Sequence, residues 1–285
     1  MKRIVSSSVL AAGLMVSAVS PLQRGPSGPT LRAGHLGFDR NEYPGDDSLN
    51  VLRRIYEFAG YWLNNPPGAS NNSWVGRRRV MQVAGFGFLV IFNGRTDAQI
   101  KAAGDATKLG SSDAAEAVTS VRREGFPPRT IIFIDQEEGG RLLPEQRGYL
   151  HAWADTVESS GFRVGVYCSG IAFKEASGAS VITAEDIRKN AGGRRLTYWV
   201  TNDSCPPSLG CAFPRKVPAP QSSGVAFAEI WQFAQSPRRA DFAGGCSGYR
   251  EDGNCYSPGV DVSKHLHIDL DVATSSDPSH GRTPD

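Results

Sequence analysis

The chain has 285 residues, of which 31 are Lys or Arg and 29 are Asp or Glu. Two of the basic residues lie in an N-terminal leader, and without it the charges balance, which argues against a nucleic-acid-binding protein with a positive surface. Hydrophobic residues make up 40% and charged residues 21%, which is ordinary for a globular protein. The length beyond the leader fits one α/β barrel.

Residues 1–18 have the features of a secretory signal peptide. Lys2 and Arg3 precede an apolar run that ends at Val19, and residues 16–18 form a small-residue cleavage pattern. The run is too short for a membrane anchor. We therefore predict a secreted, extracytoplasmic protein without a transmembrane anchor, whose mature chain begins near Val19.

Periodicity predicts eight strands and five helices. The strands are expected at 35–39, 59–63, 87–93, 130–135, 164–168, 196–201, 228–233 and 267–271. The helices are expected at 47–57, 73–84, 112–124, 141–160 and 184–190. Strands that alternate with helices imply a parallel sheet, and eight in one domain imply closure. The fold class is therefore α/β, an irregular TIM-like (β/α)8 barrel over residues 34–273 with some helices missing in the C-terminal half.

Two segments outside this barrel have little apolar content. Residues 19–33 and 274–285 are rich in Ser, Pro and Gly. Such a composition cannot bury enough apolar surface to offset the entropy lost on ordering. We therefore predict a mobile N-terminal segment and a disordered C-terminal tail.

Five cysteines support the prediction of export. Cys205 and Cys211 enclose one short loop, and Cys246 and Cys255 enclose another. In an oxidising compartment each pair is expected to form a local disulfide, because short loops are easily closed. Cys168 ends an apolar run and is expected to be free and buried.

Acidic residues on three predicted strands occupy the face opposite the apolar one. Asp39 ends the first strand, Asp135 and Glu137 end the fourth, and Asp269 and Asp271 lie near the end of the last. In a barrel this face points inward, and the C-terminal ends of the strands form the mouth where active sites lie. The pattern therefore predicts a carboxylate cluster at the mouth.

Asp135 and Glu137 are the centre of this cluster. Residues i and i+2 on a strand point the same way, with Cα atoms roughly 6.5 Å apart. Two carboxylates so placed in a shielded mouth are not both easily ionised, so one keeps a proton near neutral pH. A glycosidic oxygen needs such a proton donor. A buried strand precedes the pair and Gly139-Gly140 follows it.

Short motifs follow one another in order along most of the chain. They are Gly37-Phe38-Asp39, Phe58-Ala59-Gly60-Tyr61-Trp62, Gly85-Phe86-Gly87 with Val90-Ile91-Phe92-Asn93, Ile131 to Glu137, Gly165-Val166-Tyr167, Trp199, Trp231-Gln232 and Asp269-Leu270-Asp271. Their order and spacing resemble the glycoside-hydrolase-like domain of unknown function that is related to the family 25 lysozymes.

The resemblance implies a TIM-like barrel that hydrolyses a cell-wall or other amino-sugar glycan by carboxylate acid/base catalysis, with no cofactor and no metal. By position, Glu137 would be the general acid, Asp135 its partner and Asp39 the carboxylate of the first strand. Asp269 or Asp271 would complete the ring, and the sequence leaves open which of the two faces the site.

Aromatic residues lie near the ends of three successive predicted strands. They are Tyr167, Trp199 and Trp231. Sugar rings stack their apolar C–H faces on aromatic rings. We therefore expect these three residues, together with Gln232, to contact a polysaccharide such as peptidoglycan, and we expect the protein to act as a monomer.

Other functions fit parts of the sequence. A barrel that keeps the groove without turnover would be a non-catalytic glycan-binding or cell-wall-binding module. A metal-dependent hydrolase is another alternative, because His267, Asp269 and Asp271 share one strand face, although no pair of histidines has H-x-x-x-H spacing. A nucleophilic Cys168 has no histidine placed beside it by the sequence.

Overall fold

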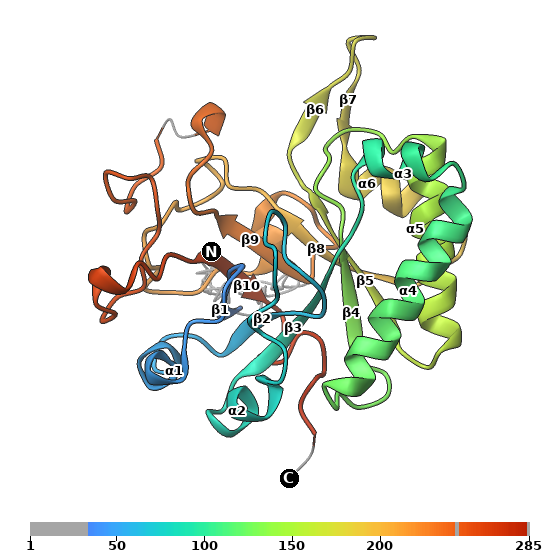
Figure 1. The fold of residues 1–285 in the computed structure, drawn as a ribbon. Coiled ribbons are helices and arrows are strands. Elements are labelled where there is room, and N and C mark those ends of the chain that lie inside the picture. The colour runs from blue at the N-terminus through green and yellow to red at the C-terminus, as the bar shows by residue number, and fades with distance from the viewer. Residues whose placement is uncertain (1–33, 243–244, 284–285) are drawn as a thin grey trace, which may run out of the picture. The chain divides into compact units, whose positions relative to one another are not determined.

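The centre of the protein is a closed barrel of eight strands. This computed structural model describes residues 34–242 and 245–283. Around the barrel the order is β1, β10, β9, β8, β5, β4, β3, β2 (Figure 1). The strands are β1 (His35–Asp39), β2 (Phe58–Trp62), β3 (Gly87–Asn93), β4 (Ile131–Asp135), β5 (Arg163–Ser169), β8 (Leu196–Thr201), β9 (Ile230–Ala234) and β10 (Asp269–Ala273). Each overlaps a predicted strand, and the predicted α/β barrel is confirmed. The predicted signal peptide and residues 19–33 lie outside the described residues.

Helices cover the first part of the barrel and are missing later, as predicted. They are α1 (Asp46–Arg53), α2 (Arg78–Val83), α3 (Asp97–Ala103), α4 (Ala106–Arg123), α5 (Pro144–Ser159) and α6 (Thr183–Lys189). Between β8 and β10 the described residues contain no α-helix, and the helical segments there are the short 3-10 turns η1 (Pro220–Ser223), η2 (Ala240–Phe242) and η3 (Val262–Lys264). The sequence reading missed α3, although the Thr96 and Gln99 side chains form a capping box at its start.

The segment between β5 and α6 contains a hairpin that was not predicted. Its strands are β6 (Ala172–Lys174) and β7 (Ser180–Ile182), which pair antiparallel and extend away from the barrel (Figure 1). Each strand has three residues, which is too short for alternation to stand out.

The last strand differs from the predicted parallel arrangement. β10 runs antiparallel to both of its neighbours, β1 and β9, whereas the other adjacent barrel strands are parallel. The connection between β9 and β10 leaves and re-enters the barrel at the same end, so it needs no crossover helix. As a consequence, β10 starts at the mouth of the barrel and ends at its floor.

Glycines inside the barrel make room for larger neighbours. A Cβ atom at Gly37 would overlap the ring of Phe58, and one at Gly165 would overlap the ring of Phe133. A Cβ atom at Gly60 would lie 2.7 Å from the Cβ of Asp39. At each of these positions a glycine lies beside a larger side chain, so the interior is filled without overlap. Gly60 in this way leaves space for the side chain of Asp39.

The predicted disordered tail is wrong for residues 274–283. The backbone N–H of Ser279 donates to the Phe88 carbonyl, and the Ile131 N–H donates to the Ser279 carbonyl, both at 2.8 Å. The Ser279 hydroxyl accepts from the Val90 N–H at 2.8 Å, and Ser279 is fully buried. The β3–β4 pairing begins only at Val90 and Ile132. The polar tail therefore satisfies backbone groups that β3 and β4 leave unpaired at the floor.

The two disulfides cross-link loops and are not the local pairs that the sequence predicted. Cys205 pairs with Cys246, and Cys211 pairs with Cys255. Each bond ties the β8–β9 connection to the β9–β10 connection, because the fold brings these two long loops together. The predicted free, buried Cys168 is confirmed.

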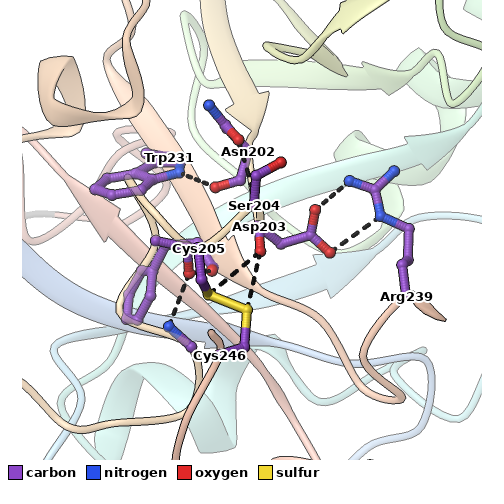
Figure 2. Close-up of a disulfide and its surroundings, with 10 residues drawn as sticks. Asn202, Asp203, Ser204, Cys205, Trp231, Arg239 and Cys246 are labelled. Atoms are coloured by element: carbon purple, nitrogen blue, oxygen red, sulfur yellow. Dashed lines mark hydrogen bonds and ion pairs between the residues drawn. A yellow bond between two sulfur atoms is a disulfide. The ribbon is translucent and has the colours of Figure 1, made fainter. Parts of the chain in front are cut away.

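Figure 2 shows the surroundings of the Cys205–Cys246 disulfide. The carbonyl oxygen of Asp203 lies 3.7 Å and 3.6 Å from its two sulfur atoms. The carboxylate of Asp203 is nearly inaccessible and forms a two-pronged ion pair with the guanidinium of Arg239. The cross-link therefore fixes the start of the β8–β9 connection and, through Asp203, the position of Arg239.

Candidate active site

A cavity of about 210 Å³ opens at the mouth of the barrel. Asp39 from the end of β1, Asp135 from the end of β4 and Asp269 from the start of β10 line it, together with Glu137. The rest of the lining is Arg40, Asn41, Trp62, Pro67, Tyr167, Trp199, Gln232, Gln235, Ser236 and His267. The structure thus brings four of the five predicted catalytic residues to one cavity.

The direction of β10 explains how Asp269 and Asp271 are placed. The sequence reading put both near the C-terminal end of the last strand, but Asp269 is its first residue and lies opposite Asp39. Asp271 lies one step deeper, opposite Gly37, and is fully buried. Both side chains face the interior because alternate residues share a face. Asp269 lines the cavity, and Asp271 lies beneath it.

Asp271 and Asp39 interact with each other, and both carboxyl groups have a raised pKa. Burial raises the pKa of Asp271 well above its usual range, and the charge of Asp39 raises it further. The Trp199 indole N–H donates to Asp271 Oδ1 at 2.9 Å. Of the two carboxyl groups, Asp271 therefore has the more strongly raised pKa.

Gln232 connects the carboxylates to Tyr167. Its amide nitrogen donates to Asp39 Oδ2 at 2.9 Å and to Asp269 Oδ2 at 3.3 Å. Its amide oxygen accepts from the Tyr167 hydroxyl at 2.7 Å. The orientation of the amide is thus set by its partners on both sides, so the network holds the side chains around the cavity in one arrangement.

Asp135 is buried and only partly satisfied. Its Oδ1 atom has no hydrogen-bond partner among the described residues, and the side chain is 7% exposed. Burial raises the pKa of Asp135 well above its usual range, and the charges of Glu137 and Asp39 add to the effect. Of the predicted acid pair, Asp135 therefore has the more strongly raised pKa.

Glu137 stands at the mouth and is exposed to solvent. Desolvation by the surrounding protein raises its pKa, and the charge of Glu138 raises it further. Glu138 itself accepts hydrogen bonds from the backbone N–H of Asp97, at the start of α3, and from the Gln146 side chain on α5. Glu138 therefore anchors the loop after β4 and thereby positions Glu137.

The predicted aromatic contacts divide into two groups. Tyr167 and Trp199 line the cavity, and their ring centroids lie 4.4 Å apart. Trp231 does not line it. Gln232 faces the interior, so the adjacent Trp231 points to the outer face, where its indole N–H donates to the Asn202 carbonyl at 2.9 Å (Figure 2). The expectation that Trp231 contacts the ligand is therefore wrong.

The sequence reading missed a cation in the site. Arg40 directly follows Asp39, and its side chain is 9% exposed. Burial lowers the pKa of Arg40, while the nearby charges of Glu42 and Asp269 oppose that effect. Trp62, the last residue of β2, also lines the cavity and donates its indole N–H to the Arg40 carbonyl at 3.1 Å. The sequence signal for this cation is that Arg40 directly follows Asp39, which was already predicted to lie in the site.

A match to a protein-family model shows the family of this barrel. The model of the Rv2525c-like, glycoside hydrolase-like domain matches residues 56–205, which run from just before β2 to Cys205. The chain belongs to this family. The resemblance to glycoside-hydrolase-like domains that the motifs predicted is thereby confirmed. No curated protein matches the chain.

Solved structures share the fold of this Rv2525c-like chain at low sequence identity. An uncharacterized protein of B. stearothermophilus is 21% identical, with 84% of this chain and 96% of that chain covered and a TM-score of 0.54. The Tat-secreted protein Rv2525c of Mycobacterium tuberculosis, in complex with L-tartrate, is 13% identical over 86% and 97% of the two chains, with a TM-score of 0.50. A lysozyme of Streptomyces coelicolor is 12% identical over 85% and 93%, with a TM-score of 0.49.

Two further observations concern the Rv2525c-like barrel. In residues 34–242 and 245–283, no helix has both the length and the apolar character needed to cross a membrane. In the same residues, His, Cys, Asp and Glu form no group of three or more arranged to hold a metal ion. His267 lines the cavity, as does Asp269, which accepts hydrogen bonds from the Gln232 amide and the Ser236 backbone N–H.

Proposed function

We propose that this Rv2525c-like domain hydrolyses O-glycosidic bonds in an extracytoplasmic amino-sugar glycan such as peptidoglycan. The observation that carries the proposal is the placement of Glu137, an exposed carboxyl group with a raised pKa beside buried carboxylates. A general acid must be protonated near the working pH and within reach of the substrate. Glu137 is exposed and its pKa is raised, which favours the protonated form, whereas Asp271 is too deeply buried to reach a polymer.

The groups around the cavity suit the steps of glycoside hydrolysis. Glu137 gives its proton to the glycosidic oxygen as the bond to the anomeric carbon breaks. Asp39, which lines the same cavity as Glu137 and accepts from the Gln232 amide, supplies negative charge near the oxocarbenium-like centre. Asp135 has a free Oδ1 for the substrate acetamido group or for water. Water adds to the anomeric carbon, and its proton returns to the Glu137 carboxylate.

Export of the protein is part of the proposal. Two disulfides join the long loops, and disulfides persist mainly in oxidising compartments. Residues 1–18 have the pattern of a signal peptide. The family member Rv2525c of M. tuberculosis is Tat-secreted, which agrees with this location.

The test compares Glu137→Gln with wild type in an assay of reducing ends released from peptidoglycan and from chitin-type polymers. Glutamine keeps the shape but cannot donate the proton, so kcat should fall about 10²- to 10⁴-fold with little change in glycan affinity. Glu158→Gln, an exposed glutamate near the end of α5, is the matched control and should leave kcat unchanged. If wild type binds these glycans and releases no more ends than Glu137→Gln, the domain is a binding module.

A further inference from the structure

A second cavity, of about 520 Å³, adjoins the one that holds the carboxylates. The two cavities share Glu137, Tyr167 and Gln235 in their linings. The rest of the lining of the second cavity comes from the loop after β4, the β5–β6 segment, the end of β8 and the loop after β9. These residues are Gly139, Ser169, Ile171, Ala172, Phe173, Thr201, Arg239 and Asp241. The second cavity is therefore a continuation of the candidate active site toward the β6–β7 hairpin.

Phe173 on β6 gives this cavity an aromatic wall. Its side chain is 52% exposed, and among the described residues it is the one aromatic side chain in the group of exposed large hydrophobic residues. The ring lies against the backbone of Gly140, where an added Cβ would lie 3.1 Å from the ring atom Cδ1. The ring is thus supported on one side and open to the cavity and solvent on the other.

The hairpin is tied to the loop that carries Glu137. The Gly140 N–H donates to the Thr183 hydroxyl at 2.8 Å, just after β7. The Arg141 guanidinium pairs with Glu175 at 3.0 Å, just after β6. These contacts join both strands of the hairpin to the segment that follows Glu137. Phe173 is therefore held in place relative to the candidate acid and is not a loosely attached surface residue.

The second cavity also has polar lining residues. Arg239 lies there, held by Asp203 next to the Cys205–Cys246 disulfide (Figure 2). Asp241 and Gln235 add an acceptor and an amide. A sugar ring has an apolar C–H face and a polar edge of hydroxyl groups, so a cavity lined by an exposed aromatic ring and by polar side chains offers partners for both surfaces.

Glu137 lines two cavities besides the one that holds the carboxylates, and one of these is the Phe173 cavity. The other, of about 560 Å³, lies beside the ends of β2 and β3, while the Phe173 cavity lies beside the ends of β5 and β8. In the barrel order β4 lies between these two pairs of strands. A glycan chain that occupies both cavities therefore passes over Glu137.

We propose that the Phe173 cavity is a subsite for a sugar adjacent to the cleaved bond, with Phe173 as its stacking platform. The inference rests on the proposed function and extends it by assigning a specificity residue and a site for a neighbouring sugar. Phe173 supplies binding energy to an extended glycan and has no part in proton transfer. Its removal therefore weakens glycan binding and leaves the pH dependence of turnover unchanged.

The test measures the affinity of a peptidoglycan hexasaccharide by calorimetry in the Glu137→Gln background, which cannot cleave the ligand. Phe173→Ala should weaken binding about 3- to 10-fold, the range expected for the loss of an exposed aromatic contact. Phe173→Tyr keeps the ring and should bind like its parent, whereas Phe173→Leu keeps apolar bulk without a ring and should resemble the alanine variant. Val83→Ala, at an 81% exposed site on α2, is the control.

The results separate the subsite from the proposed function. If the wild type cleaves peptidoglycan but Phe173→Ala and Phe173→Leu bind the hexasaccharide as tightly as their parent, the subsite is wrong and the hydrolase stands. If the leucine variant binds as well as the tyrosine variant, stacking is wrong. If the unsubstituted protein neither binds nor cleaves the glycan, both proposals fail together.

Discussion

Asp39 and Asp269 lie directly opposite each other across β1 and β10, at the mouth of the barrel. The amide of Gln232 donates to both, at 2.9 Å and 3.3 Å. This arrangement depends on the antiparallel direction of β10. A parallel strand in the same place would begin at the floor of the barrel, and its first residue would lie far from the last residue of β1.

The pKa of Glu137 is raised by desolvation from the surrounding protein and by the charge of Glu138, whereas the buried Asp135 has its own pKa raised more strongly. The charge of Asp135 is not among the causes that raise the pKa of Glu137. Asp135→Asn should therefore leave the basic limb of the kcat/KM pH profile in place. Glu138→Gln removes a like charge and should move that limb to lower pH. A shift with Asp135→Asn as large as that with Glu138→Gln would contradict this reading.

Asp271 gives the protein a pH-dependent stability. Its folded-state pKa is raised well above the usual value by burial and by Asp39, so the folded state binds more protons than the unfolded state. The free energy of unfolding should therefore fall as pH rises above about 4 toward the folded-state pKa. Asp271→Asn still accepts from Trp199 and has no proton to lose. In urea denaturation it should gain stability over wild type as pH rises, with the difference vanishing near pH 4.

The cross-linked loops predict a specific peptide map. Digestion without reduction should release peptides that join Cys205 to Cys246 and Cys211 to Cys255. The sequence separations are 41 and 44 residues, for which the chain-entropy model gives about 4 kcal/mol of stabilisation per bond. The Cys205→Ser/Cys246→Ser variant should therefore unfold at lower denaturant concentration. Recovery of the local pairs would overturn the assignment.

Ser279 anchors the C-terminal segment to the floor of the barrel. Ser279→Ala removes the acceptor of the Val90 N–H and leaves that buried group unpaired, which should cost about 1–3 kcal/mol of unfolding free energy. A chain that ends at Ala273 should lose more, since Phe88 and Ile131 also lose partners. Ser222→Ala, an exposed serine in η1, is the control for denaturant unfolding. If Ser279→Ala and the chain that ends at Ala273 both unfold at the same denaturant concentration as wild type, the C-terminal segment does not contribute to stability.

Local patterns in the sequence determined the eight strands, the missing late helices and the face that carries the carboxylates. Alternation depends only on neighbours along the chain, so it places Asp39, Asp135 and Asp271 on inward positions without knowledge of the fold. The same rule, applied to Trp231 and Gln232, shows that the two cannot both face the cavity. That misplacement was therefore avoidable from the sequence.

Long-range contacts determined the direction of β10, the disulfide partners and the order of the C-terminal segment. These features depend on which distant segments of the chain meet in space. The direction of β10 follows from where a 34-residue connection re-enters the barrel, and it alone puts Asp269 rather than Asp271 at the mouth. The disulfide partners follow from two loops that lie together, and the order of the tail follows from unpaired backbone groups at the floor. Composition and spacing are properties of one segment, whereas each of these features requires a partner that is distant in the sequence.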